Sequence, residues 1–283
     1  MKHYIELTKP RITWLILMST AVGYYFGASA GAGWLLFFHT ILGTGLIASG
    51  TAALNQWWER EADRKMRRTA QRPIPSGRLS ARQALVFGIA LSVAGFADLA
   101  LGANLLAAML GGGTLLAYLF LYTPLKQRSP FSTTVGALPG AMPPMIGFAA
   151  ARGALTLEAW VLFLILFLWQ FPHFLAIAWM YREDYARAGI LMLPVTEPDG
   201  KATARQMVLY ALVLLPVSLL PAALGMSGKF YVLGAVALGS LFLYSTLRVA
   251  FDRTIVRARK VLLASVVYLP LVYGLLILDR PRL

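Results

Sequence analysis

Three oxygen-bearing side chains recur at every fourth position in one stretch of the sequence, Asn55, Glu59 and Asp63. On a helix, this spacing places them along one face. Mg²⁺ prefers oxygen ligands and is commonly held by one or two carboxylates together with substrate phosphates. Because the chain has only 12 Asp and Glu residues, two carboxylates beside an amide on one stripe indicate a magnesium site. The alternative is a solvated helix end with ion pairs between successive turns.

The segment that follows, residues 64–78, is densely basic and is interrupted by Pro73, Pro75 and Gly77. Its basic residues are Arg64, Lys65, Arg67, Arg68, Arg72 and Arg78. Arginine offers paired donors to phosphate oxygens, so an anion bridged to the metal would find counter-charges here, and diphosphate is the natural candidate. The alternative is an ordinary basic loop on the cytoplasmic side of a membrane.

A second polar group follows a later apolar stretch. It comprises Tyr181, Arg182, Glu183, Asp184 and Tyr185. His173 lies within the apolar stretch itself, next to Pro172. A histidine at membrane depth is a functional candidate, and the alternative is a structural histidine hydrogen-bonded to a neighbouring helix.

The elements that must position these residues are membrane helices. Hydrophobic residues make up 58% of the chain and charged residues only 13%, which a water-soluble domain could not accommodate. A helix needs about 20 apolar residues to cross the bilayer. Nine stretches qualify: 12–29, 34–54, 83–101, 104–122, 131–150, 157–180, 206–225, 229–250 and 261–278. We therefore expect an all-α, polytopic bundle of nine transmembrane helices that forms one domain over residues 1–283.

The distribution of basic residues predicts the orientation of this bundle. The net charge is +14, and the basic residues gather at the N-terminus and in the connections 55–82, 126–128, 181–205 and 248–260. That side is expected to be cytoplasmic, so the charge reports membrane orientation and not nucleic acid binding. Both polar groups lie on it, at the ends of the second and sixth spans. Spans one to four and five to eight can thus be interpreted as two parallel halves, with the ninth left over.

Two further features of the sequence limit the possible chemistry and the possible location of the protein. The chain has 0 cysteines, which excludes thiolate metal sites, disulfides and cysteine nucleophiles. Its polar N-terminus runs into an apolar span without a recognisable cleavage site, so we expect a retained first helix and a bacterial plasma membrane location.

Several motifs together resemble one family. Asn55-x-x-x-Glu59-x-x-x-Asp63 with the following Arg72-Pro73-x-Pro75-x-Gly77-Arg78 resembles the first motif of UbiA-type membrane prenyltransferases. More narrowly, the segments 55–59, 122–126, 136–144 and 169–174 are similar to the heme O synthase branch of that family. Glu59, where the wider family has an aspartate, also resembles this branch. The second motif departs enough to leave its metal ligand open between Glu183 and Asp184.

The resemblance implies transfer of a farnesyl group from farnesyl diphosphate to the vinyl group of heme B, giving heme O. It implies Mg²⁺ held by Asn55, Glu59 and Asp63, with Asp184 for a second ion. Lys65, Arg67, Arg68, Arg72, Lys126 and Arg182 would supply positive charge. Trp57, Trp58, Phe171, Tyr181 and Tyr185 would line the cavity, and His173 would contact the heme substrate.

The resemblance also implies a downstream heme A synthase or terminal oxidase as a partner. Two rival functions remain: prenylation of an aromatic quinone precursor, and transport of an anionic metabolite across the membrane.

Overall fold

The computed structural model describes residues 1–28 and 33–281, and every regular element in these ranges is a helix, as predicted. The helices are α1 (Lys2–Leu7), α2 (Pro10–Gly27), α3 (Trp34–Trp58), α4 (Arg60–Lys65), α5 (Ala81–Gly102), α6 (Leu105–Leu116), the π-helix η1 (Ala117–Tyr122), α7 (Thr123–Leu125), α8 (Ser132–Gly140), α9 (Pro143–Arg152), α10 (Leu157–Met180), α11 (Arg182–Arg187), α12 (Leu193–Thr196), α13 (Lys201–Val217), α14 (Leu220–Ala223), α15 (Lys229–Phe251) and α16 (Ile255–Leu278).

Seven helical segments in the described part of the chain are long and apolar enough to cross a membrane. They are Trp34–Trp58, Ala81–Gly102, Leu105–Leu125, Leu157–Met180, Lys201–Ala223, Lys229–Phe251 and Ile255–Leu278. Each overlaps one of the predicted spans, so the chain is a multi-pass membrane protein. The other two predicted spans are helical but do not meet this criterion, so the count of nine is not confirmed.

The two remaining predicted spans miss this criterion for separate reasons. The stretch 12–29 corresponds to α2, which has 18 residues and carries a proline and an arginine in its first turn; residue 29 lies outside the described residues. The stretch 131–150 is divided into α8 and α9, and the division falls just before Pro143 and Pro144. Because proline has no backbone N–H and clashes with the preceding turn, a continuous helix is interrupted there.

Close packing between α3 and α5 depends on glycines spaced seven residues apart. A Cβ on Gly95 would lie 2.6 Å from the carbonyl oxygen of Gly43, and a Cβ on Gly50 would lie 2.8 Å from that of Gly88. The two helices therefore approach backbone to backbone, as small residues allow in membrane bundles. This contact fixes α3, whose last turn carries Asn55, the first of the three predicted metal ligands.

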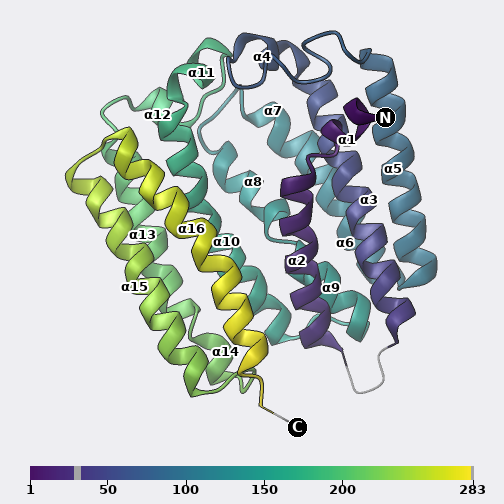
Figure 1. Cartoon of the computed structure of the whole chain (residues 1–283), viewed down its shortest axis with the longest axis vertical. Coiled ribbons are helices and arrows are strands. Elements are labelled where there is room, and N and C mark those ends of the chain that lie inside the picture. The colour runs from purple at the N-terminus through teal and green to yellow at the C-terminus, as the bar shows by residue number, and fades with distance from the viewer. Residues whose placement is uncertain (29–32, 282–283) are drawn as a thin grey trace.

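The central helix of the bundle is α10. Of its apolar window 72% is buried inside the protein, against 22–39% for the other candidate spans. The short helices α4, α11 and α12 gather at one end of the bundle, together with the N-terminus, while the C-terminus lies at the other end (Figure 1). The helix ends that carry both polar groups therefore meet at one end of the molecule.

Candidate active site

The stripe of Asn55, Glu59 and Asp63 spans the junction between α3 and α4. Glu59 is the residue between the two helices, with φ −87° and ψ 8°, so the single continuous helix expected from the sequence is interrupted there. The spacing nevertheless survives, because the Glu59 N–H donates to the Asn55 carbonyl at 2.9 Å and the Asp63 N–H donates to the Glu59 carbonyl at 2.8 Å. The three side chains remain on successive turns.

Each oxygen donor of this stripe is already paired with a basic side chain from elsewhere in the chain. The pairs are Lys9 Nζ with Asn55 Oδ1 at 3.3 Å, Lys126 Nζ with Glu59 Oε1 at 2.7 Å, and Arg72 Nη1 with Asp63 Oδ2 at 2.7 Å. Asn55 also donates to the Thr123 hydroxyl at 3.3 Å. The site is thus a buried, alternating arrangement of oxygen donors and cations.

A magnesium ion fits these residues. Asp63 is fully buried, and its Oδ1 has no hydrogen-bond partner among residues 1–28 and 33–281. A buried carboxylate oxygen without a partner is costly, and a cation would satisfy it. No group of three or more His, Asp or Glu residues that could hold a metal alone occurs among the described residues. A Mg²⁺ ion bound here would share its shell with substrate phosphates and water.

The charges of the site are unequal. Burial by itself would raise the pKa of Glu59. The ammonium of Lys126, together with the charge of Lys9 and a hydrogen bond from Asn55, outweighs burial and leaves that pKa below its ordinary value. Burial would lower the pKa of Lys126, yet Glu59 holds it well above its ordinary value. For Lys9, burial and then the repulsion from Arg72 lower the pKa to about 7. Three basic side chains, Lys9, Lys126 and Arg72, thus face only two carboxylates, Glu59 and Asp63, and this arrangement is suited to an anion.

The second polar group packs beside the first. The backbone N–H of Arg67 donates to Asp184 Oδ1 at 3.4 Å, and Arg187 forms an ion pair with the same carboxylate. Arg68 lies over the rings of Tyr181 and Tyr185, at 4.8 and 5.4 Å from their centroids. Asp184 is buried whereas its neighbour Glu183 is exposed, so of the two alternatives it is Asp184 that faces the first group.

Several predicted residues lie outside this cluster. The side chains of Lys65 and Arg67 are exposed. Trp58 is 39% exposed and packs against Phe120, and Trp57 lies beneath Arg60. Arg182 lies over the ring of Trp179, 4.6 Å from its centroid. The structure does not bring these side chains to the stripe.

His173 is held within the bundle by α16. Its Nδ1 lies 2.8 Å from the Ser265 hydroxyl, and its ring stacks on Trp169 at 4.8 Å. Phe171 stacks on Tyr210 with ring centroids 3.7 Å apart. Both contacts belong to the packing of α10 against α13 and α16.

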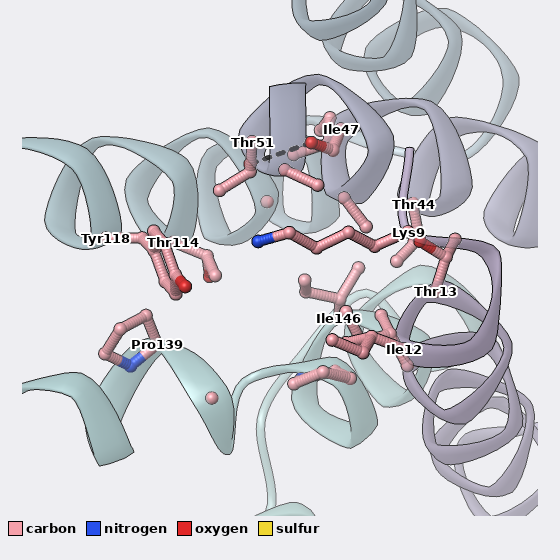
Figure 2. A pocket seen from close by; sticks show the side chains of 16 residues that line it. Lys9, Ile12, Thr13, Thr44, Ile47, Thr51, Thr114, Tyr118, Pro139 and Ile146 are labelled. Carbon is pink, nitrogen blue, oxygen red and sulfur yellow. Dashed lines mark hydrogen bonds between the residues drawn. The ribbon is translucent and has the colours of Figure 1, made fainter. Parts of the chain in front are cut away.

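An apolar cavity of about 140 Å³ lies next to the stripe, between α2, α3, α6 and α9 (Figure 2). Its lining includes Thr51 and Ala52, which lie one turn before Asn55 on α3. Most of the wall is aliphatic, with Ile12, Ile47 and Ile146 among its members. The arrangement joins a charged site to an apolar chamber and is suited to an amphiphile with an anionic head.

Sequence reasoning did not assign Lys9, Tyr118 or Thr123 to the site. Lys9 counted only as a basic residue of the N-terminus, although it lines the cavity. Tyr118 and Thr123 lie in and directly after the π-helix η1, where the Thr123 hydroxyl donates to the Tyr118 carbonyl at 2.9 Å. Single π-turns often occur at functional sites. In the sequence, Pro124 indicates an irregular helix at this point, because a proline removes one of the helical hydrogen bonds.

Comparison with known proteins agrees with the fold and identifies the family. Residues 16–269 match the UbiA prenyltransferase family, and the chain belongs to this family. It is 67% identical to the protoheme IX farnesyltransferase of Solibacter usitatus, over 100% of both chains, and 47% identical to that of Koribacter versatilis, over 99% of this chain and 94% of the relative.

Solved structures share the fold at low sequence identity. A chain from a structural study of digeranylgeranylglyceryl phosphate synthase has a TM-score of 0.82 and 20% identity, and covers 99% of this chain and 98% of its own. A UbiA homolog from Archaeoglobus fulgidus bound to GPP and Mg²⁺ has a TM-score of 0.63 and 17% identity, and covers 97% of this chain and 99% of its own.

Proposed function

We infer that this chain transfers a farnesyl group from farnesyl diphosphate to the vinyl group of heme B, which gives heme O. The relatives named protoheme IX farnesyltransferase match it over nearly its full length. The observation that carries the proposal is the junction of a buried, cation-rich oxygen stripe with an apolar cavity. This junction suits a diphosphate joined to an isoprenoid chain.

Mg²⁺ would be held by Asn55, Glu59 and Asp63, and Asp184 is available for a second ion. When bound, Mg²⁺ neutralises the diphosphate and stabilises the charge that develops on it as it leaves. The orphaned Oδ1 of Asp63 supports this assignment, as does the Archaeoglobus fulgidus homolog of the same fold that binds GPP and Mg²⁺.

The side chains of the protein bind, orient and shield the reactants. Lys126 and Arg72 lie against the stripe and add fixed positive charge to the diphosphate site, while Arg68 adds charge from the side of Tyr181. The apolar cavity keeps water from the isoprenoid. The allylic C–O bond breaks with its electron pair on the diphosphate, the vinyl group attacks the allylic carbon, and water adds to the resulting cation and releases a proton.

We also propose the finer topology of the chain. It crosses the membrane nine times, with the N-terminus and the active site on the cytoplasmic face of a bacterial plasma membrane, as the positive-inside rule predicts. The placement of the termini at opposite ends of the bundle supports an odd number of crossings (Figure 1). Residues 1–283 form one domain whose first four and next four spans are parallel halves. A heme A synthase or a terminal oxidase would consume the product.

The test is incubation of the purified protein in detergent with heme B, farnesyl diphosphate and Mg²⁺, followed by mass spectrometry of the heme fraction. We expect a farnesylated, hydrated heme that requires both the diphosphate and the metal. Prenylation of 4-hydroxybenzoate without any heme product would instead assign the chain to quinone precursor synthesis.

A further inference from the structure

Lys9 has an unusual backbone conformation. Its φ is 48° and its ψ is 62°, and among residues 1–28 and 33–281 it is the only non-glycine residue with positive φ. The left-handed region is disfavoured for a residue with a Cβ, and the following Pro10 restricts the preceding backbone further. Such a conformation persists only where the surrounding structure holds it, and it is found disproportionately at functional sites.

The chain on both sides of Lys9 is fixed in place. Leu7 is fully buried, and its carbonyl accepts a hydrogen bond from the Gln56 side chain at 2.8 Å. The Thr8 carbonyl accepts one from the Thr13 hydroxyl at 2.7 Å. Gln56 is the residue directly after Asn55, so the segment before α2 is tied to the metal-site stripe itself.

The result of this conformation is the position of the Lys9 ammonium. The side chain extends across the cavity, with its nitrogen directed toward the side of Tyr118 and Pro139 (Figure 2). Its Nζ lies 3.3 Å from Asn55 Oδ1. Lys9 is the one charged residue in the described lining of the cavity. An ammonium at an apolar wall is costly unless it meets an anion.

We propose that Lys9 is a catalytic residue that donates a hydrogen bond to the diphosphate oxygen bound to C1 of the isoprenoid. The inference rests on the proposed function. If the stripe holds the diphosphate and the cavity holds the isoprenoid, then the bond that joins them lies at the boundary between the two, where the Lys9 ammonium is located. As the C1–O bond breaks and its electron pair leaves with the diphosphate, Lys9 keeps its proton and stabilises the growing negative charge.

The absence of cysteine from the chain permits a selective test. Lys9→Cys is prepared and then alkylated in two ways: aminoethylation, which restores an ammonium at nearly the length of lysine, and hydroxyethylation, which gives a neutral chain of the same length. The extent of each reaction is followed by mass spectrometry. We measure kcat and KM for farnesyl diphosphate in the heme assay.

We expect Lys9→Cys to lose about 100-fold in kcat, the usual effect of removing one donor to a developing oxyanion. Aminoethylation should raise kcat at least about 10-fold above that of unmodified Lys9→Cys. Hydroxyethylation should leave kcat at the level of Lys9→Cys, because only a charged donor replaces the missing interaction. The inference is overturned if Lys9→Cys keeps kcat within about threefold of the unmodified chain, or if the two alkylated forms are equally active.

Two further variants separate this role from folding and from the proposed function. Lys9→Gly accepts the left-handed conformation without strain, so it should unfold at the same or a higher temperature than the wild type. Its binding of 2-fluorofarnesyl diphosphate, an analogue that keeps the oxygen on C1 but ionises slowly, should weaken. Undiminished binding by Lys9→Gly would contradict the inference. Lys2→Cys, at an exposed lysine of α1, is the matched control and should respond to neither reagent. If the wild type itself forms no farnesylated heme, it is the proposed function that fails, whereas the analogue-binding comparison still tests Lys9.

Discussion

At the scale of single residues, the sequence pattern contains all three oxygen donors of the site but only one of the cations paired with them, Arg72. Asn55, Glu59 and Asp63 could be found because a period of four is visible in the sequence itself. The Lys9–Asn55 contact joins residues 46 positions apart, and Lys126–Glu59 joins residues 67 positions apart. Lys126 was recognised only by resemblance, and Lys9 was missed, because such pairs form only when the helices pack.

Asp63→Asn tests the metal site while preserving the volume of the side chain. It removes the charge from a fully buried carboxylate whose Oδ1 has no hydrogen-bond partner in the described part of the chain, so the affinity for Mg²⁺ should fall. We expect turnover to decrease by at least about 100-fold and excess Mg²⁺ to restore little of it. Product formation over a Mg²⁺ titration measures this. Asp199→Asn, at an exposed loop residue, is the control, and equal activity of both variants would remove the metal-site assignment.

Lys126→Met tests whether the Lys126 ammonium occupies the position beside Glu59 that Mg²⁺ would take. The Lys126–Glu59 pair is buried, with side chains 13% and 11% exposed, and removing one member of such a pair leaves an uncompensated charge. We expect a loss of about 3 kcal/mol in the free energy of unfolding when no metal is present. Mg²⁺ should recover part of it, because Glu59 is then free to bind the ion. Thermal unfolding with Mg²⁺ or EDTA is the measurement, and a loss that Mg²⁺ leaves unchanged would argue against a ligand role for Glu59.

At the scale of elements, apolar length predicted the long helices well, since about 20 apolar residues in a row have few other stable structures in lipid. It did not predict where a helix is interrupted. The interruption at Glu59, the π-turn Ala117–Tyr122 and the division between α8 and α9 all escaped it. These details depend on single prolines and on tertiary hydrogen bonds, which hydropathy does not register, and two of them lie beside the active site.

The contact between α2 and α9 is the element-scale feature most open to test. A Cβ on Gly147 would collide with the Thr20 carbonyl oxygen of α2. Gly147→Ala should therefore push the two helices apart and cost about 3 kcal/mol, the upper range for overpacking. Activity should fall as well, since α2 begins directly after Lys9 and carries Ile12 of the cavity wall.

Gly113→Ala is the matched control for this substitution. Gly113 lies inside α6, and a Cβ there would meet no described atom within 4 Å. The change should therefore leave stability unaltered or raise it by about 0.5–1 kcal/mol through helix propensity. Thermal unfolding of both variants in detergent provides the comparison. Equal midpoints would show that the α2–α9 approach is not as close as the structure has it.

At the scale of the whole molecule, the number of crossings depends on α2 and on the chain between α7 and α10, of which the second is open to a direct test. Helix α7 lies near the end of the bundle that carries the active site, α9 lies toward the other end, and α10 leads back to α11 (Figure 1). If α8 and α9 together cross the membrane, Gln127 and Ala154 lie on opposite faces. If they do not cross, both residues lie on the same face. The two arrangements thus differ in the placement of two exposed residues.

Single cysteines can decide between them because the chain has none of its own. We expect Gln127→Cys to react with a membrane-impermeant maleimide only in inverted vesicles, where the cytoplasmic face is outward, and Ala154→Cys only in right-side-out vesicles. Ser76→Cys, in the basic segment beside the stripe, marks the face of the active site and should behave like Gln127→Cys. Labelling of Gln127→Cys and Ala154→Cys from the same side would exclude the crossing by α8 and α9. Labelling of Ser76→Cys only in right-side-out vesicles would place the active site on the outer face, against the distribution of arginine and lysine.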